Sequence, residues 1–281
     1  MKKQLTIMIV TVLFAFVANA QDEFVSKKGI PILPEAGDYS IGINAAPFLT
    51  YFGNMLNGTN GNAAPTWGYT AANPMKITGK YMVNANTAYR LMFRLGFTST
   101  NNKNYVMQDG QATPDPLVTV EDLWKNSQMN VGLGAGIENR RGKGRIQGVY
   151  GAMAMLGFET YKDTYTYGNS YSATNMNPNR TNFNGNNLGA AWLLDYKNGT
   201  TINFGVLAFV GAEYFFAPKF SLSGEFNYGL EFASTGDGSY NVEEWDGANA
   251  VIKTSTVTTG GNSAFGLDTG VGASLNLNFY F

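Results

Sequence analysis

Nine charged side chains of this 281-residue chain occupy alternate positions in extended, otherwise apolar segments. Successive side chains of a β-strand point to opposite faces, so each of these charges would lie opposite a row of apolar residues. An isolated buried charge is costly, and we therefore expect the set to pair in a shared interior as a charge network. It comprises four bases and five acids: Lys80, Arg90, Arg94, Glu138, Arg145, Glu213, Glu225, Glu231 and Asp268.

The residue types exclude most catalytic chemistry. The chain contains no His and no Cys, which excludes Ser–His triads, Cys nucleophiles and the usual zinc sites. Three neighbouring carboxylates, Glu243, Glu244 and Asp246, lack the spacing of a calcium loop. We therefore expect that the protein is not an enzyme, and we assign no catalytic residue, cofactor or metal. The alternative is an enzyme that uses a pair of carboxylates at one rim of the fold for acid–base chemistry.

The last seventeen residues, 265–281, alternate between apolar side chains and small or polar ones. A strand of a soluble protein usually has about five or six residues, whereas a tilted strand needs about 9–11 residues to cross a membrane. The pattern therefore predicts a membrane-crossing strand that ends on the aromatic residues Phe279, Tyr280 and Phe281.

Seven earlier segments alternate in the same way, and the connections between all eight alternate between short turns and long loops. An even number of strands suits a closed antiparallel barrel, in which short turns face the periplasm and long loops face outward. We therefore predict an all-β fold, a transmembrane up-and-down antiparallel barrel of eight strands. The earlier segments are 39–49, 76–83, 87–98, 128–139, 145–159, 201–216 and 220–233, and the long loops are 50–75, 99–127, 160–200 and 234–264.

A barrel of ten strands is the alternative. Segment 188–196 is followed by Asn198-Gly199, a strong hairpin signal. If both arms of that hairpin crossed the membrane, the alternation of turn lengths would fail. We therefore expect the hairpin to extend beyond the membrane.

The N-terminal sequence predicts export. Lys2 and Lys3 precede an apolar run, 5–17, and the small residues Ala18-Asn19-Ala20, which is the layout of a secretory signal peptide over 1–20. Residues 21–37 would form a periplasmic lead and 38–281 the barrel. Charged residues make up only 14% of the chain, against about 25% in soluble domains. With 19 basic and 20 acidic residues, nothing favours a nucleic-acid partner.

Three stretches carry a resemblance to a known group of proteins. They are V-S-K-K-G-I-P-I-L-P-E-A-G-D-Y at 25–39, A-P-F-L-T-Y-F-G-N at 46–54, and the terminal Phe281. Together with the signal peptide, they resemble small outer-membrane barrels of Bacteroidota and, more broadly, eight-stranded barrels of the OmpA/OmpX type. The resemblance implies a place in the cell outer membrane, in contact with its lipid and lipopolysaccharide. It also implies that the barrel insertion machinery reads Phe279, Tyr280 and Phe281.

The third long loop is the best candidate for a binding surface. It carries Tyr161, Tyr165, Tyr167 and Tyr171 among many Asn, Ser and Thr residues, a composition that makes adaptable contacts. A glycan or another outer-membrane protein would be the partner; a mobile polar loop is the alternative. We expect a structural or interaction role with a lumen closed by the charge network. A narrow channel for small solutes or protons, and an outer-membrane enzyme using carboxylates, are the alternatives.

Overall fold

The computed structural model describes residues 25–59, 61–62 and 76–281, and their side chains except at 46–47 and 267–273. The predicted signal peptide, 1–20, and residues 21–24 of the lead lie outside the described residues. Apart from one helix, the regular elements of the described chain are β-strands, and all their pairings are antiparallel. The predicted all-β, up-and-down fold is therefore confirmed.

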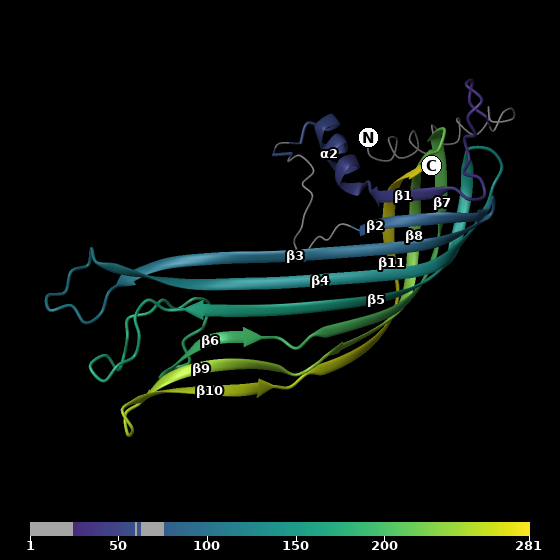
Figure 1. Cartoon of the computed structure of the whole chain (residues 1–281). Coiled ribbons are helices and arrows are strands. Elements are labelled where there is room, and N and C mark those ends of the chain that lie inside the picture. The colour runs from purple at the N-terminus through teal and green to yellow at the C-terminus, as the bar shows by residue number, and fades with distance from the viewer. Residues whose placement is uncertain (1–24, 60, 63–75) are drawn as a thin grey trace.

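Eight strands form a closed ring (Figure 1). Each pairs with the next, and the last closes on the first through Ile41 opposite Phe279 and Ile43 opposite Leu277. Tight turns join three pairs of these strands at one end, termed the short-turn end, where Tyr39 and Phe281 also exchange backbone hydrogen bonds. In order around the ring, the strands are β1 (Tyr39–Asn44), β2 (Lys76–Asn84), β3 (Thr87–Met107), β4 (Thr119–Arg141), β5 (Ile146–Thr166), β7 (Thr201–Ala217), β8 (Phe220–Thr235) and β11 (Asn262–Tyr280).

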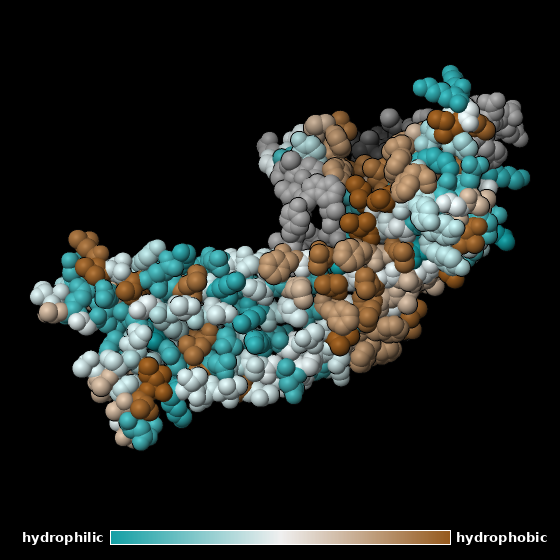
Figure 2. Space-filling view, in the orientation of Figure 1, coloured by the Kyte–Doolittle hydropathy of each residue, from teal (hydrophilic) through white to brown (hydrophobic). Residues whose placement is uncertain are grey.

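The ring is apolar on its outer face, and its interior holds many polar and charged side chains. Every ring strand exposes at least one large apolar side chain, and these side chains form the brown band across the ring in Figure 2. Many of the most buried residues are instead charged or polar. One outward residue from each strand, in ring order, is Ile41, Ile77, Leu91, Leu133, Leu156, Val206, Phe226 and Leu277.

Beyond the ring, β3, β4 and β5 continue into an open sheet, termed the distal sheet, at the left of Figure 1. Three further strands complete it: β6 (Ala191–Lys197), β9 (Gly238–Asp246) and β10 (Val251–Thr259). The prediction that residues 99–127, 160–200 and 234–264 form loops is therefore wrong in large part, because strands cover much of these ranges. Backbone pairing continues there, but both faces of these strands are largely polar, so no apolar row reveals them.

Two local predictions were also wrong. The strand predicted over 39–49 ends at Asn44, and helix α2 (Ala46–Leu56) follows, because Pro47 has no N–H for a strand ladder and suits the first turn of a helix. β6 pairs with β5 and β9 rather than with β7, so the predicted hairpin at Asn198-Gly199 does not form, and β6 stays outside the ring. No helix among the described residues has the length and apolar character needed to cross a membrane.

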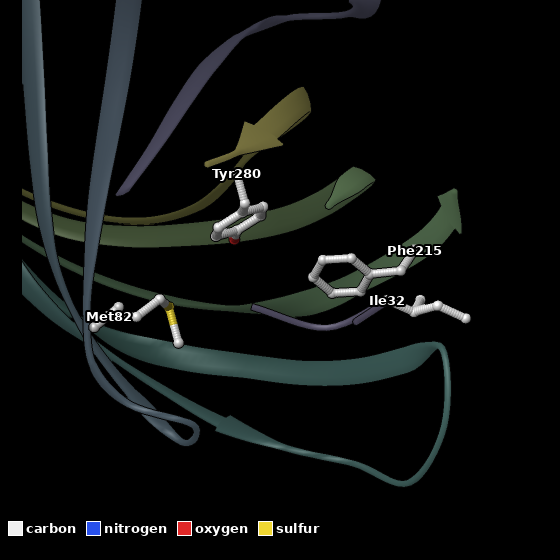
Figure 3. Packing of buried hydrophobic residues seen from close by; sticks show 5 residues of the cluster. Ile32, Met82, Phe215 and Tyr280 are labelled. Atoms are coloured by element: carbon white, nitrogen blue, oxygen red, sulfur yellow. The ribbon is translucent and has the colours of Figure 1, made fainter. Parts of the chain in front are cut away.

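An apolar cluster fills the short-turn end of the ring (Figure 3). Ile32 of the lead packs against Met82, Ala88, Phe215 and Tyr280, all of them buried. The carbonyl of Ile32 also accepts a hydrogen bond of 3.1 Å from the N–H of Lys219 in the β7–β8 turn. The lead therefore packs into the short-turn end of the ring through Ile32.

Interior glycines allow neighbouring strands to approach closely. Gly151 lies opposite Glu138 on one side and Phe209 on the other. A Cβ atom at this position would lie 1.9 Å from the carbonyl oxygen of Ile137 and 2.7 Å from Phe209 Cζ. The backbone of β4 cannot yield as a flexible side chain could, so this glycine is a steric requirement of the ring.

We predict that Gly151→Ala lowers the free energy of unfolding by about 1–3 kcal/mol, the usual cost of overpacking. Urea unfolding of the refolded protein, followed by the mobility shift between folded and unfolded bands on gels, would measure the loss. Gly224→Ala is the matched control, because its Cβ would meet nothing closer than Leu275 Cδ1 at 3.7 Å. Equal stability of the two variants would contradict the prediction.

Candidate functional site

The interior of the ring holds a charge cluster of three bases and three acids. All six side chains belong to residues that are at most 5% exposed. The cluster is formally neutral, as a water-poor interior requires, because a buried charge without a partner is strongly destabilising. The members are Lys80, Arg90, Glu138, Arg140, Glu213 and Glu225.

Glu213 of β7 is the most connected member. Its Oε2 atom accepts from Lys80 Nζ at 3.2 Å and from Arg140. Its Oε1 atom accepts from Asn278 Nδ2 at 3.0 Å, from the Tyr280 hydroxyl at 2.9 Å, and from the Ser221 hydroxyl. These partners come from β2, β4, β8 and β11, so one carboxylate ties together strands from around the ring.

Glu138 and Glu225 complete the cluster. Glu138 bridges the bases, with Lys80 Nζ at 3.0 Å, Arg140 Nε at 2.8 Å and Arg90 Nη1 at 3.3 Å. Both terminal nitrogens of Arg90 donate to Glu225 Oε2 at 3.1 Å. The guanidinium of Arg90 also lies 4.2 Å from the ring centroid of Phe209, a cation–π contact. The network therefore extends from the apolar cluster towards the middle of the ring.

Five of the nine charges predicted for the interior lie in this cluster: Lys80, Arg90, Glu138, Glu213 and Glu225. Arg94 lies farther from the short-turn end, opposite Lys76 and half-buried. Arg145 instead donates to the carbonyls of Phe215 and Phe216 at 3.1 Å, and Glu231 is exposed. The side chain of Asp268 lies outside the described residues.

Among the members of the network that sequence reasoning missed are Arg140 and Tyr280. Arg140 lies outside the predicted strands 128–139 and 145–159, yet it lies two residues after Glu138 and therefore on the same face of β4. Tyr280 had been assigned to the terminal aromatic signal, yet it lies two residues after Asn278 on the interior face of β11. The same alternation, continued to the ends of both strands, would have found them.

The other terminal aromatics face outward. Phe279 is 43% exposed and packs against Phe220, with 4.6 Å between ring centroids. Phe281 is 58% exposed and stacks on Tyr39 at 6.4 Å. The terminal triplet therefore has two outward rings flanking one buried ring.

A cavity of about 410 Å³ adjoins the charge cluster on the side away from the short-turn end. Arg90 and Glu225 line it from the cluster. Its apolar lining consists of Met92, Met153, Met155, Leu207, Phe209 and Leu275, and its remaining polar lining of Asn44, Lys76, Thr78, Asn227, Ser274 and Asn276. The interior is thus packed at the short-turn end and hollow above the charges.

A second cluster, termed the distal cluster, surrounds Arg180 at the far end of the molecule. The Arg180 guanidinium lies 4.4 Å from the ring centroid of Tyr167, 4.6 Å from that of Tyr171 and 5.9 Å from that of Trp192. Arg180 Nη1 also lies 2.6 Å from Glu243 Oε1 on β9. This single cation therefore binds the third loop to β6 and β9.

The four tyrosines predicted to form a binding surface all contact other groups of the distal part. The Tyr167 hydroxyl donates to the carbonyl of Leu193 at 2.6 Å, and that of Tyr171 donates to Ala190 at 2.9 Å. Burial raises the pKa of both hydroxyls. Tyr165 stacks on Trp124 at 6.3 Å, and Tyr161 meets Tyr196 edge-on at 6.3 Å.

Buried polar side chains hold the rest of the third loop. Asp122 is fully buried and accepts from the backbone N–H groups of Gly168 at 2.8 Å and Thr181 at 2.6 Å. Asn169 is 4% exposed and donates to the carbonyls of Met107 and Asn179. The third loop is therefore a folded part of the distal sheet.

No protein-family model matches the sequence, and no curated protein matches it. The arrangement of residues must therefore carry any functional conclusion.

The charge cluster links strands from around the ring. Its carboxylates are already bound by bases, and the groups that hold them come from five strands of the ring: β2, β3, β4, β8 and β11. Charge-assisted hydrogen bonds are stronger than neutral ones, and a low local dielectric strengthens them further. The cluster thus fixes the registers of distant strands relative to one another.

We predict that Glu213→Gln lowers the free energy of unfolding by about 3–5 kcal/mol, because it leaves Lys80 and Arg140 with an uncompensated buried charge. Urea unfolding of refolded protein would measure this loss. Glu231→Gln makes the same chemical change at an exposed carboxylate and should have little effect. Variants of equal stability would show that the cluster does not brace the ring.

We also predict that Arg180→Ala loosens the distal part without opening the ring. Loss of the contacts to three aromatic rings and Glu243 should speed amide hydrogen exchange in residues 167–190 by about tenfold or more. Arg141→Ala, at the exposed end of β4, is the control. Unchanged exchange in residues 167–190 would contradict the role assigned to Arg180.

Proposed function

We propose that the ring is a β-barrel embedded in the cell outer membrane, with a closed lumen and a structural or interaction role. The observation that carries this proposal is the inverted distribution of polarity. Outward side chains such as Leu91, Phe93 and Phe226 are 62%, 44% and 53% exposed, whereas Glu138 and Glu213 are fully buried. A monomer in water rarely exposes a contiguous apolar band of this extent, whereas lipid requires one.

Closure of the ring supports a membrane location. Hydrocarbon offers no hydrogen bonds, so a sheet that crosses it must pair all its strands and leave no open edge. Eight strands in a closed antiparallel ring meet this condition. Outward aromatic rings at the short-turn end, among them Tyr39, Tyr81 and Phe279, would lie at the membrane interface.

The contents of the lumen support a closed barrel rather than a channel. An eight-stranded barrel is only wide enough for side chains to fill. Here the apolar cluster with Ile32 occupies one end, and the charge cluster lies directly above it. A narrow path for solutes or protons would have to cross both layers.

The distal sheet supports an interaction role. It is a folded extension of β3, β4 and β5, and it would face outward if the short turns face the periplasm. Its neighbours there would be lipopolysaccharide, a glycan or another outer-membrane protein. In this proposal the insertion machinery reads the terminal strand through Phe279, Tyr280 and Phe281.

We expect the refolded mature protein to show a heat-modifiable gel shift but no steady single-channel conductance in planar bilayers. A shift without conductance would agree with a barrel closed by its interior charges. Steady conductance that changes on Arg90→Ala or Glu225→Ala would make the protein a channel. Absence of any shift in lipid or detergent would reject the membrane barrel itself.

A further inference from the structure

Helix α2 has an uncharged apolar face that is exposed. Its eleven residues include no Lys, Arg, Asp or Glu. Because successive residues of a helix are about 100° apart, its exposed apolar side chains fall on one side, opposite Thr50 and Asn54. Phe52 and Leu56 are 51% and 82% exposed. The exposed apolar residues of the helix are Leu49, Phe52, Met55 and Leu56.

The start of α2 is fixed against the ring. β1 ends at Asn44, and the helix begins two residues later (Figure 1). The N–H of Ala45 donates to the carbonyl of Leu275 in β11 at 2.8 Å. The end of β1 therefore sets the position at which the helix leaves the ring.

β1 ends before the apolar band of the ring does. Ile43 of β1 lies opposite Ile77 of β2, and Ile77 lies opposite Phe93 of β3. β3 continues outward with Leu95 and Phe97, both exposed. At about 3.3 Å per residue and a tilt of about 40°, Phe97 lies about 10 Å farther along the axis of the ring than Phe93.

The strand on the other side of β1 also continues beyond it. β11 pairs with β1 as far as Asn276 opposite Asn44. Beyond that pair, Phe265 of β11 lies opposite Phe232 of β8, and both side chains are exposed. Outward apolar residues therefore continue on both sides of the gap that opens where β1 ends, and α2 starts in that gap.

We propose that α2 lies in the membrane beside the ring, with its apolar face against the acyl chains of the outer leaflet. The proposal rests on the membrane barrel proposed above and adds a second lipid contact to it. An amphipathic helix in the interface buries its apolar face at the boundary of the acyl chains. Because the short turns would face the periplasm, the far end of β1 and the helix after it belong to the outer leaflet.

The polar groups near the helix suit this location. The side chain of Asn54 donates to Asn62 Oδ1 at 3.3 Å, and that of Asn62 donates to the carbonyl of Tyr51 at 2.9 Å. The N–H of Asn57 donates to the carbonyl of Gly53 at 3.0 Å. A helix satisfies its own backbone groups, as lipid requires, and this one brings no charge into the membrane.

Lipid fits the exposed face better than a protein partner does. The four exposed side chains are three aliphatic or thioether groups and one phenyl ring, without a hydrogen-bond donor or a charge. Protein interfaces usually include several direct hydrogen bonds, which set the orientation of the partners. Acyl chains need none, and the neighbouring outward face of the ring has the same apolar character.

Single-cysteine labelling would test this location, because the chain has no Cys. The full mature protein, refolded into phosphatidylcholine vesicles, would carry a bimane fluorophore at one position at a time. The quenchers would be phosphatidylcholine with a doxyl group on its acyl chain and, separately, iodide in the water. Phe52→Cys and Leu56→Cys report on the apolar face, and Thr50→Cys is the matched control on the opposite side. Leu91→Cys, outward on β3, marks the hydrocarbon, and Leu117→Cys, in the distal part, marks water.

Doxyl lipid should quench the labels at positions 52 and 56 at least about twofold more than the label at position 50. Quenching of both apolar-face labels by iodide, as at position 117, would overturn the proposal while leaving the barrel in lipid. Protection from both quenchers would also overturn it, because protein would then cover the face. If doxyl lipid failed to quench the label at position 91, the membrane barrel itself would be rejected.

A charge on the apolar face should move the helix out of the lipid. In the Leu56→Cys protein, Phe52→Asp should reduce quenching by doxyl lipid about twofold or more, because a carboxylate is costly in hydrocarbon. Thr50→Asp adds the same charge on the opposite side and should leave the quenching unchanged. Equal effects of the two substitutions would contradict the assigned face. A heat-modifiable gel shift would show that each variant has refolded.

Discussion

Neutrality of the buried charge cluster is the constraint on which the ring depends. The charged side chains of the cluster are buried, so each carboxylate there needs a base within hydrogen-bonding distance. Glu213 and Glu138 share Lys80 and Arg140, and Arg90 links Glu138 to Glu225. These contacts form only when the strands hold one set of registers. Glycines such as Gly151 supply the space that the long side chains require.

The two clusters show two ways of keeping a cation out of water. Inside the ring, Lys80 and Arg140 are held by carboxylates. In the distal part, Arg180 lies over the rings of Tyr167 and Tyr171 and has a single carboxylate partner, Glu243. A planar guanidinium can stack on aromatic faces, which a compact ammonium group does less well. Aromatic residues therefore replace some of the acids that a second buried charge cluster would need.

Sequence alone predicts the ring strands well because their outward face must be apolar along its whole length. Leu91, Phe93 and Leu95 mark β3 clearly for this reason, whereas residues 99–107 of the same strand are mostly polar and carry no such mark. The alternation also predicts which residues face the interior, as Glu138 with Arg140 and Asn278 with Tyr280 show. It does not predict which interior residues pair with one another. Lys80 and Glu213 are 133 positions apart, and only the closed ring brings them together.

The uninterrupted pairing of β3, β4 and β5 has a mechanical consequence. The β3–β4 ladder runs without a register shift from the ring, where Thr87 lies opposite Asn139, to the distal sheet, where Met107 lies opposite Thr119. Hinges are usually loop or terminal residues, and these strands place none between the two parts. A pull on the tip of the distal sheet would load many backbone hydrogen bonds in shear at once rather than unzip them singly. The continuous ladders therefore join the distal sheet to the ring as one stiff unit.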